Sequence, residues 1–236
     1  MDIYENIIIG NFLYGAGIAM GRSAHAEGVP LSVNLLQQTP LDHGAADVLV
    51  RGSRVMRLLE FKRFRSNNIK EASKLLHLKR ALSVPVIDHL EELSREVHWY
   101  LESESSSSVL NLRIVPYLDF TNRALPGPSL QQFIDEMVAE AISVGQDKSE
   151  LYSEYLDVVA KCQGAPKGGS GALIVSVDGG GRLNYAVVEN LRELGLSLSR
   201  YHQLNQDRQI SLQPQQELQK HNVRGRESPE RGGHSL

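Results

Sequence analysis

Three side chains between residues 47 and 62 have the types and spacing that metal-assisted hydrolysis needs. Asp47 begins one β-rich run, and Glu60 and Lys62 end the next, with a glycine-containing connection between the two runs. Mg²⁺ prefers carboxylate oxygens and usually keeps several waters and a substrate phosphate among its ligands. The metal lowers the pKa of a bound water, and a nearby lysine can orient that water or stabilise developing charge. The pattern therefore indicates phosphodiester hydrolysis at this site.

Strand geometry predicts that these three residues meet. Alternate side chains in a strand share a face, so Glu60 and Lys62 point to the same side. With the turn centred near residues 52–53, Asp47 is expected to pair close to residue 58, about one register step from Glu60. The alternative interpretation of an acid and a lysine two residues apart is a simple ion pair at a strand end.

Positive charge is concentrated around these acids. The whole chain has a net charge of −3, but residues 51–80 contain ten basic and two acidic residues, a net charge of +8. A protein polarised in this way can hold a phosphate backbone on one side. The alternative is a solvated charged helix with two hairpin arginines. The residues that we expect to contact nucleic acid are Arg63, Arg65, Lys70 and Lys74.

The segments Asp47-Val-Leu-Val and Leu-Leu-Glu60-Phe-Lys62-Arg, with the connection between them, resemble the PD-(D/E)xK, or restriction-endonuclease-like, nuclease superfamily. The resemblance covers roughly residues 1–120. It implies a mixed four-stranded sheet flanked by helices and cleavage of phosphodiesters with Mg²⁺ or Mn²⁺. Position by position, Asp47 matches the motif aspartate, Glu60 the second acid and Lys62 the catalytic lysine, with the two acids as metal ligands.

The sequence departs from the family pattern at its first acid. Ala46 precedes Asp47 where the family has proline, and a literal Pro-x-Asp occurs at Pro40-Leu-Asp42, so Asp42 competes for the same role. Many members also contribute a glutamate from the first helix, which makes Glu5 a third candidate metal ligand. An acid at a helix N-terminus also interacts favourably with the helix dipole, which is the alternative explanation for Glu5.

The implied function is a DNA endonuclease, with DNA favoured over RNA, of the sort found in restriction, repair or phage defence. The alternative is a non-catalytic relative that keeps the fold and binds nucleic acid or protein in a larger complex. The chain has no recognisable DNA-reading motif, so a homodimer or another protein is expected to assist target selection.

Composition limits the remaining classes of protein. The chain has 236 residues, 41% of them hydrophobic, which is enough for one sizeable core. Its single cysteine, Cys162, excludes a disulfide framework and a cysteine-ligated metal site built by this chain alone, and it predicts a cytoplasmic setting. Residues 6–21 lack charge, but 16 residues fall short of the roughly 20 that a membrane span needs. We therefore expect a buried first helix and no membrane partner.

The pattern of elements predicts an α/β (α+β) fold with a mixed central sheet flanked by helices. One domain is expected over residues 1–202, with its core in about 1–120, extra helices and a hairpin in 121–202, and a polar tail over 203–236. Helices are expected near 3–20, 66–82, 87–101, 129–144, 148–162 and 187–195. Strands are expected near 31–36, 46–50, 55–62, 110–120, 172–177 and 182–188.

Overall fold

The described residues all belong to one unit of the chain. The chain divides into two compact units, Met1–Leu198 and Ser199–Leu236. The second unit lies outside the described residues, and so does the expected polar tail. The computed structural model describes residues 4–23, 32–35, 46–52, 54–63, 66, 69–103, 111–163, 172–177 and 183–188.

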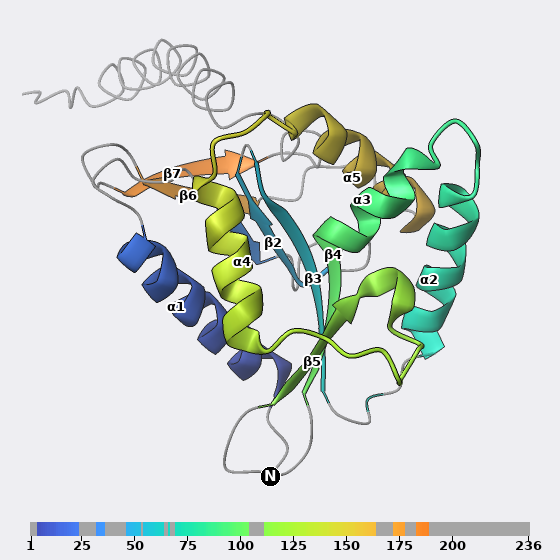
Figure 1. Cartoon of the computed structure of the whole chain (residues 1–236), viewed down its shortest axis with the longest axis horizontal. Coiled ribbons are helices and arrows are strands. Elements are labelled where there is room, and N and C mark those ends of the chain that lie inside the picture. The colour runs from blue at the N-terminus through green and yellow to red at the C-terminus, as the bar shows by residue number, and fades with distance from the viewer. Residues whose placement is uncertain are drawn as a thin grey trace, which may run out of the picture. The chain divides into compact units, whose positions relative to one another are not determined.

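A five-stranded mixed sheet forms the centre of this unit (Figure 1). Its strands are β1 (Ser32–Leu35), β2 (Val48–Arg51), β3 (Met56–Lys62), β4 (His98–Ser103) and β5 (Leu112–Pro116). They lie side by side in chain order, and every neighbouring pair is antiparallel except β3 and β4, which are parallel. A parallel pair needs a crossover connection, and this one contains the helices α2 (Ile69–Leu82) and α3 (His89–Val97).

Helices cover both faces of the sheet (Figure 1). α1 (Glu5–Ser23) and α4 (Leu130–Ile142) lie on one face, and α2, α3 and α5 (Ser149–Gln163) lie on the other. The predicted mixed sheet with flanking helices is therefore confirmed. Burying a large apolar side chain contributes roughly 1.5–3 kcal/mol. The core under α1 and α4 includes Ile8, Ile9, Phe12, Val48, Val50, Leu59, Phe61, Leu101, Ile114, Phe133 and Met137.

The first helix buries one side against the sheet and exposes the other. Ile8, Ile9 and Phe12 are buried, whereas Tyr4 and Tyr14 are exposed. The helix predicted over residues 3–20 is confirmed and continues to Ser23. Within the described ranges, no helix combines the length and the hydropathy that crossing a membrane would require.

The main correction to the predicted elements concerns β4. The sequence predicted one helix through residue 101, but α3 ends at Val97 and His98 begins a strand. This strand is paired with β3 on one side and β5 on the other, so tertiary pairing overrides a helical spacing of leucines. Leu101 is buried among the α1 and α4 residues, and Trp99 packs edge-on against Phe133 with 5.0 Å between ring centroids.

The C-terminal strands form a second, two-stranded sheet. β6 (Ala172–Val177) pairs antiparallel with β7 (Leu183–Val188), as the sequence predicted. The prediction of a closing helix from residue 187 is wrong for its first two residues, because β7 continues to Val188. The rest of that expected helix, after residue 188, lies outside the described residues.

We expect Gly127→Ala to destabilise the fold by about 3 kcal/mol. A Cβ atom at this position would lie 1.7 Å from the carbonyl oxygen of Ile114 in β5, so backbone has to move. Gly145→Ala is the matched control, because its added Cβ would meet no atom within 4 Å, and its effect is expected to stay within about 0.5 kcal/mol. Urea denaturation measures both free energies of unfolding, and equal values would contradict the close contact.

Candidate active site

Asp47 comes just before the first paired residue of β2 and contacts the end of β3. The described ladder ends with the pair of Val48 and Leu59. The Asp47 backbone N–H donates to the Leu59 carbonyl at 3.0 Å, which places Asp47 next to Glu60. The sequence predicted a partner close to residue 58, about one register step from Glu60. Arg51 still belongs to β2, so the turn is centred one residue later than expected and Asp47 lies nearer to Glu60.

The Asp47 and Glu60 carboxylates are both buried, with only 5% and 4% of each residue exposed. Asp47 Oδ2 accepts a hydrogen bond of 2.6 Å from the Phe61 N–H, which fixes this carboxylate against β3. The Lys62 Nζ donates to Glu60 Oε1, and the Lys62 side chain keeps 17% of its surface exposed. The structure therefore brings the three predicted catalytic residues together at one end of the sheet.

The helix α2 adds a third acid, Glu71, which the sequence analysis did not assign to this site, and a second lysine, Lys74, which it predicted only as a nucleic-acid contact. Glu71 is buried, and its Oε1 lies 3.0 Å from the Lys74 Nζ. Its Oε2 accepts a hydrogen bond of 2.8 Å from the hydroxyl of Tyr117, which begins the 3₁₀ helix η1 (Tyr117–Asp119). The spacing of Glu71 and Lys74 predicts a pair on one helix face, but nothing local in the sequence connects Tyr117 with them.

Burial and mutual repulsion dominate the electrostatics of this cluster. Burial, and next the charge of Asp47, raise the pKa of Glu60 to about 8, although Lys62 opposes the shift. Burial alone would lower the pKa of Lys62, but the charges of Glu60 and Asp47 outweigh it and raise that pKa. The pKa of Glu71 is lowered, because Lys74 outweighs the opposing effect of burial. Burial and the charge of Asp47 thus disfavour the ionised form of Glu60, whereas the neighbouring lysines favour the ionised form of Glu71.

His98 adds no positive charge to the cluster. Its ring is buried and stacks on Tyr117 with 4.1 Å between centroids, and its Nδ1 shares a 2.8 Å hydrogen bond with the Tyr155 hydroxyl. Burial, together with the positive charge of Lys74, lowers the pKa of His98 to about 3. The imidazole is therefore neutral at physiological pH.

The donor chemistry of Asp47 and Glu60 fits Mg²⁺ or Mn²⁺. Both supply hard carboxylate oxygens, and Mg²⁺ needs only one or two of these beside water and substrate oxygens. A divalent cation would also relieve the repulsion that raises the pKa of Glu60. Among the described residues, however, no group of three or more His, Cys, Asp or Glu side chains is arranged to hold a metal ion.

The third predicted metal ligand, Glu5, reaches the same end of β3. Its Oε1 accepts a hydrogen bond of 3.0 Å from the backbone N–H of Arg63, the residue after Lys62. The guanidinium of Arg63 lies over the ring of Tyr4, 5.8 Å from its centroid. The structure thus holds Glu5 next to the site without joining it to a three-carboxylate group.

The predicted nucleic-acid contacts lie in different surroundings. Lys70 is exposed on α2, whereas Lys74 belongs to the buried cluster with 23% of its side chain exposed. Arg65 lies outside the described residues, and so does Asp42. Of the two candidate motif aspartates, only Asp47 therefore has a described position.

Three arginines of the basic window connect the hairpin to neighbouring helices. Arg51 donates to the Ser149 carbonyl at 3.0 Å, and Arg57 forms two hydrogen bonds to the Glu140 carboxylate, of 3.0 and 2.5 Å. Arg54 donates to two backbone carbonyls just after α4. These contacts use donors that the charge pattern alone would assign to nucleic acid. Arg51, Arg54 and Arg57 therefore have structural hydrogen bonds, and the expectation of nucleic-acid contacts does not include them.

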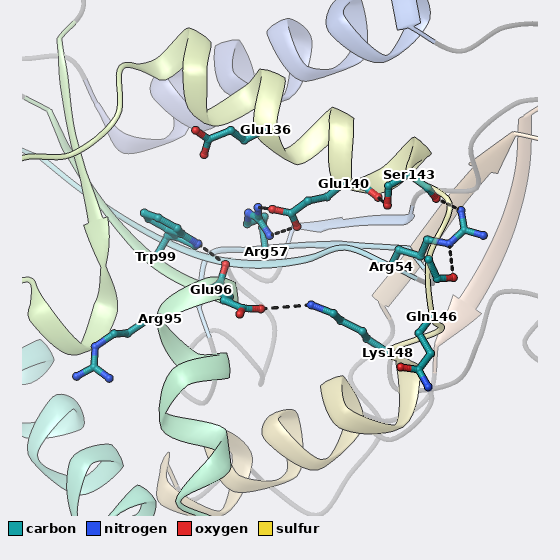
Figure 2. A pocket seen from close by; sticks show the side chains of 11 residues that line it. Arg54, Arg57, Arg95, Glu96, Trp99, Glu136, Glu140, Ser143, Gln146 and Lys148 are labelled. Atoms are coloured by element: carbon teal, nitrogen blue, oxygen red, sulfur yellow. Dashed lines mark hydrogen bonds and ion pairs between the residues drawn. The ribbon is translucent and has the colours of Figure 1, made fainter.

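A pocket of about 570 Å³ lies beside these arginines, near the start of β3 rather than its end. Figure 2 shows Arg57 pointing toward Glu140 and Lys148 toward Glu96, and the second pair is separated by 3.4 Å. The other two basic residues that line the pocket are likewise hydrogen-bonded. Each of its four cations has a partner within the described residues, as Lys62 and Lys74 do. We consider the Asp47–Glu60 cluster the better candidate for chemistry because it has buried carboxylates that could hold a metal ion.

Comparisons of the chain with protein-family models, with curated proteins and with solved structures find no match. The fold and the site together define a mixed α/β protein with a buried cluster of acids and lysines at the ends of two adjacent strands. Function must therefore be inferred from the residues and geometry of this cluster.

We expect Glu60→Gln and Glu71→Gln to change stability in opposite directions when metal is removed with EDTA. The raised pKa of Glu60 means that ionising it costs stability as pH rises from about 4.5 through about 8. The free energy of unfolding of Glu60→Gln, relative to that of the wild type, should therefore be higher at pH 9 than at pH 5 by at least about 1 kcal/mol. This difference corresponds to roughly 2–4 °C in Tm.

The lowered pKa of Glu71 has the opposite consequence. Its ionised form stabilises the fold above about pH 4.5, and this contribution is lost as pH falls through the folded-state pKa. Glu71→Gln should therefore have a lower Tm than the wild type at pH 7, with a smaller difference under acidic conditions. Thermal unfolding followed by circular dichroism checks both variants, and parallel pH profiles for the two would contradict the assigned electrostatics.

Proposed function

We propose that the chain is a metal-dependent nuclease that hydrolyses phosphodiester bonds in DNA, with Mg²⁺ or Mn²⁺ as its cofactor. The observation that carries this proposal is that Asp47 is hydrogen-bonded to the β3 backbone on either side of Glu60, with Lys62 bonded to Glu60 at the same buried strand end. The resemblance to PD-(D/E)xK nucleases assigns catalytic roles to the same three positions. The mixed sheet with helices on both faces is consistent with the restriction-endonuclease-like core that this proposal requires.

Each of the three residues has a defined task under this proposal. Asp47 and Glu60 would hold the metal, which when bound supplies an acidified water and neutralises charge on the phosphate. Lys62 now donates to Glu60 Oε1, and a cation on that carboxylate would compete for the same oxygen. Lys62 would then be free to orient water or to stabilise the transition state. Burial strengthens these interactions, because less water is present to screen them.

The substrate would approach where the two lysines of the cluster reach solvent. Lys62 and Lys74 keep 17% and 23% of their side chains exposed, and the exposed Lys70 extends positive charge along α2. Phosphate contacts of this kind supply most of the sequence-independent affinity for nucleic acid. A role in restriction, repair or phage defence follows from the family resemblance alone.

We expect Lys62→Ala and Glu60→Ala to lower the rate of DNA cleavage by about 100-fold or more. Lys62→Ala removes a charge-stabilising donor and Glu60→Ala a metal ligand. Lys148→Ala is the matched control, because this exposed lysine pairs with Glu96 outside the site and should cleave like the wild type. The assay uses supercoiled plasmid, single-stranded DNA and RNA, each with Mg²⁺, Mn²⁺ or EDTA.

The outcomes separate an enzyme from a binding module. Cleavage that survives equally in all variants would identify a contaminant and remove the support for nuclease activity. DNA binding without cleavage, unchanged by Mg²⁺, Mn²⁺ or EDTA, would favour the non-catalytic alternative. Cleavage of RNA but not DNA would overturn the proposed substrate and leave the assignment of the three residues intact.

A further inference from the structure

The cluster contains a second lysine that the resemblance does not account for. Lys74 comes from α2, whereas Asp47, Glu60 and Lys62 come from the hairpin. It is partly exposed, like Lys62, and the charges of Glu60 and Glu71 both act on it. Lys74 of α2 therefore interacts electrostatically with Glu60, whereas Lys62 of β3 contacts that carboxylate directly.

Lys74 is held in place by a chain of two buried groups. Glu71 Oε1 pairs with the Lys74 ammonium at 3.0 Å, and Glu71 Oε2 accepts the Tyr117 hydroxyl at 2.8 Å. Tyr117 is itself fixed, because its buried ring stacks on His98. A carboxylate engaged at both oxygens has little freedom to rotate, so it restricts the ammonium that it binds.

Stability alone gives little reason for this arrangement. Replacing a buried ion pair with apolar residues of similar size is often neutral or stabilising, because removing charges from water is costly. Glu71 is only 5% exposed, so the pair it forms with Lys74 carries that cost. A cation held beside Glu60 does have a direct electrostatic effect on that carboxylate and on any anion that approaches it.

We propose that Lys74 is a second phosphate-binding residue of the active site, positioned by Glu71 and Tyr117, so that two lysines contact the scissile phosphate. The inference rests on the proposed nuclease function and adds to it a residue and a positioning device. Lys62 and Lys74 would reach the phosphate from different elements, one from β3 and one from α2. Tyr117 and Glu71 contact no substrate and act through Lys74.

The first test compares cleavage kinetics. Lys74→Met should lower kcat/KM for DNA cleavage by about 100-fold, and Lys74→Arg should restore part of that loss. Tyr117→Phe removes only the hydroxyl that holds Glu71 and should lower kcat by about tenfold. Lys79→Met is the lysine control, an exposed residue on the same helix. Tyr155→Phe is the tyrosine control, because that hydroxyl contacts His98 and Ser94 rather than Glu71.

The second test measures Mn²⁺ binding by calorimetry or electron paramagnetic resonance, without substrate. Removing the charge of Lys74 makes the cluster more negative, so Lys74→Met should bind Mn²⁺ roughly five- to tenfold more tightly while cleaving more slowly. Glu71→Gln should weaken Mn²⁺ binding, because it removes a negative charge. A substitution that merely loosens the core would weaken metal binding and cleavage together.

The results distinguish this inference from the function on which it rests. A wild-type protein that binds no Mn²⁺ and cleaves no nucleic acid overturns both. Wild-type cleavage with a Lys74→Met variant that cleaves equally well overturns only the role of Lys74. Loss of cleavage accompanied by weaker Mn²⁺ binding in Lys74→Met would assign the residue a structural role and also overturn the inference.

Discussion

The antiparallel register of β2 and β3 is the constraint on which the rest of the site depends. A strand has a side-chain period of two, so a slip of one residue would move Asp47 or Glu60 to the opposite face of the sheet. The buried residues Val48, Val50 and Leu59 fix that register, because they must face α1 and α4. The hydrophobic pattern on one face of the hairpin thus determines where the acids lie on the other.

The helices after residue 121 support this hairpin although they contribute none of the proposed catalytic residues. Burial lowers the pKa of Arg51 to about 10. Arg51 still donates a hydrogen bond to the Ser149 carbonyl of α5, and its guanidinium lies over the ring of Tyr152. Arg57 binds Glu140 of α4 on the opposite face of the sheet. Because side chains alternate along adjacent strands, Arg51 and Arg57 lie on opposite faces of the hairpin. Each face is therefore hydrogen-bonded to a different helix. The C-terminal helices therefore act as a frame for the site.

Local patterns predicted the hairpin and the acid–lysine motif, because alternation and a glycine-containing turn are properties of neighbouring residues. They did not predict β4, since leucines spaced for a helix continue to Leu101, and only pairing with β3 and β5 makes this segment a strand. Tyr117 was also missed. It lies 46 residues from Glu71 in the chain, and nothing in either local sequence indicates that the fold brings them into contact. Long-range pairing decided both features.

The repulsion between Asp47 and Glu60 links the stability of the fold to the proposed chemistry. Glu60 is buried beside Asp47 and His98 is neutral, so ionising Glu60 costs stability. A divalent cation bound between Asp47 and Glu60 would remove that repulsion, and any ligand that binds only the folded chain stabilises it. The same repulsion would then increase the affinity of the two carboxylates for the metal. Lys74 limits this repulsion from the helix side, which would keep the site folded before the metal arrives and leave an ammonium group in place for the phosphate.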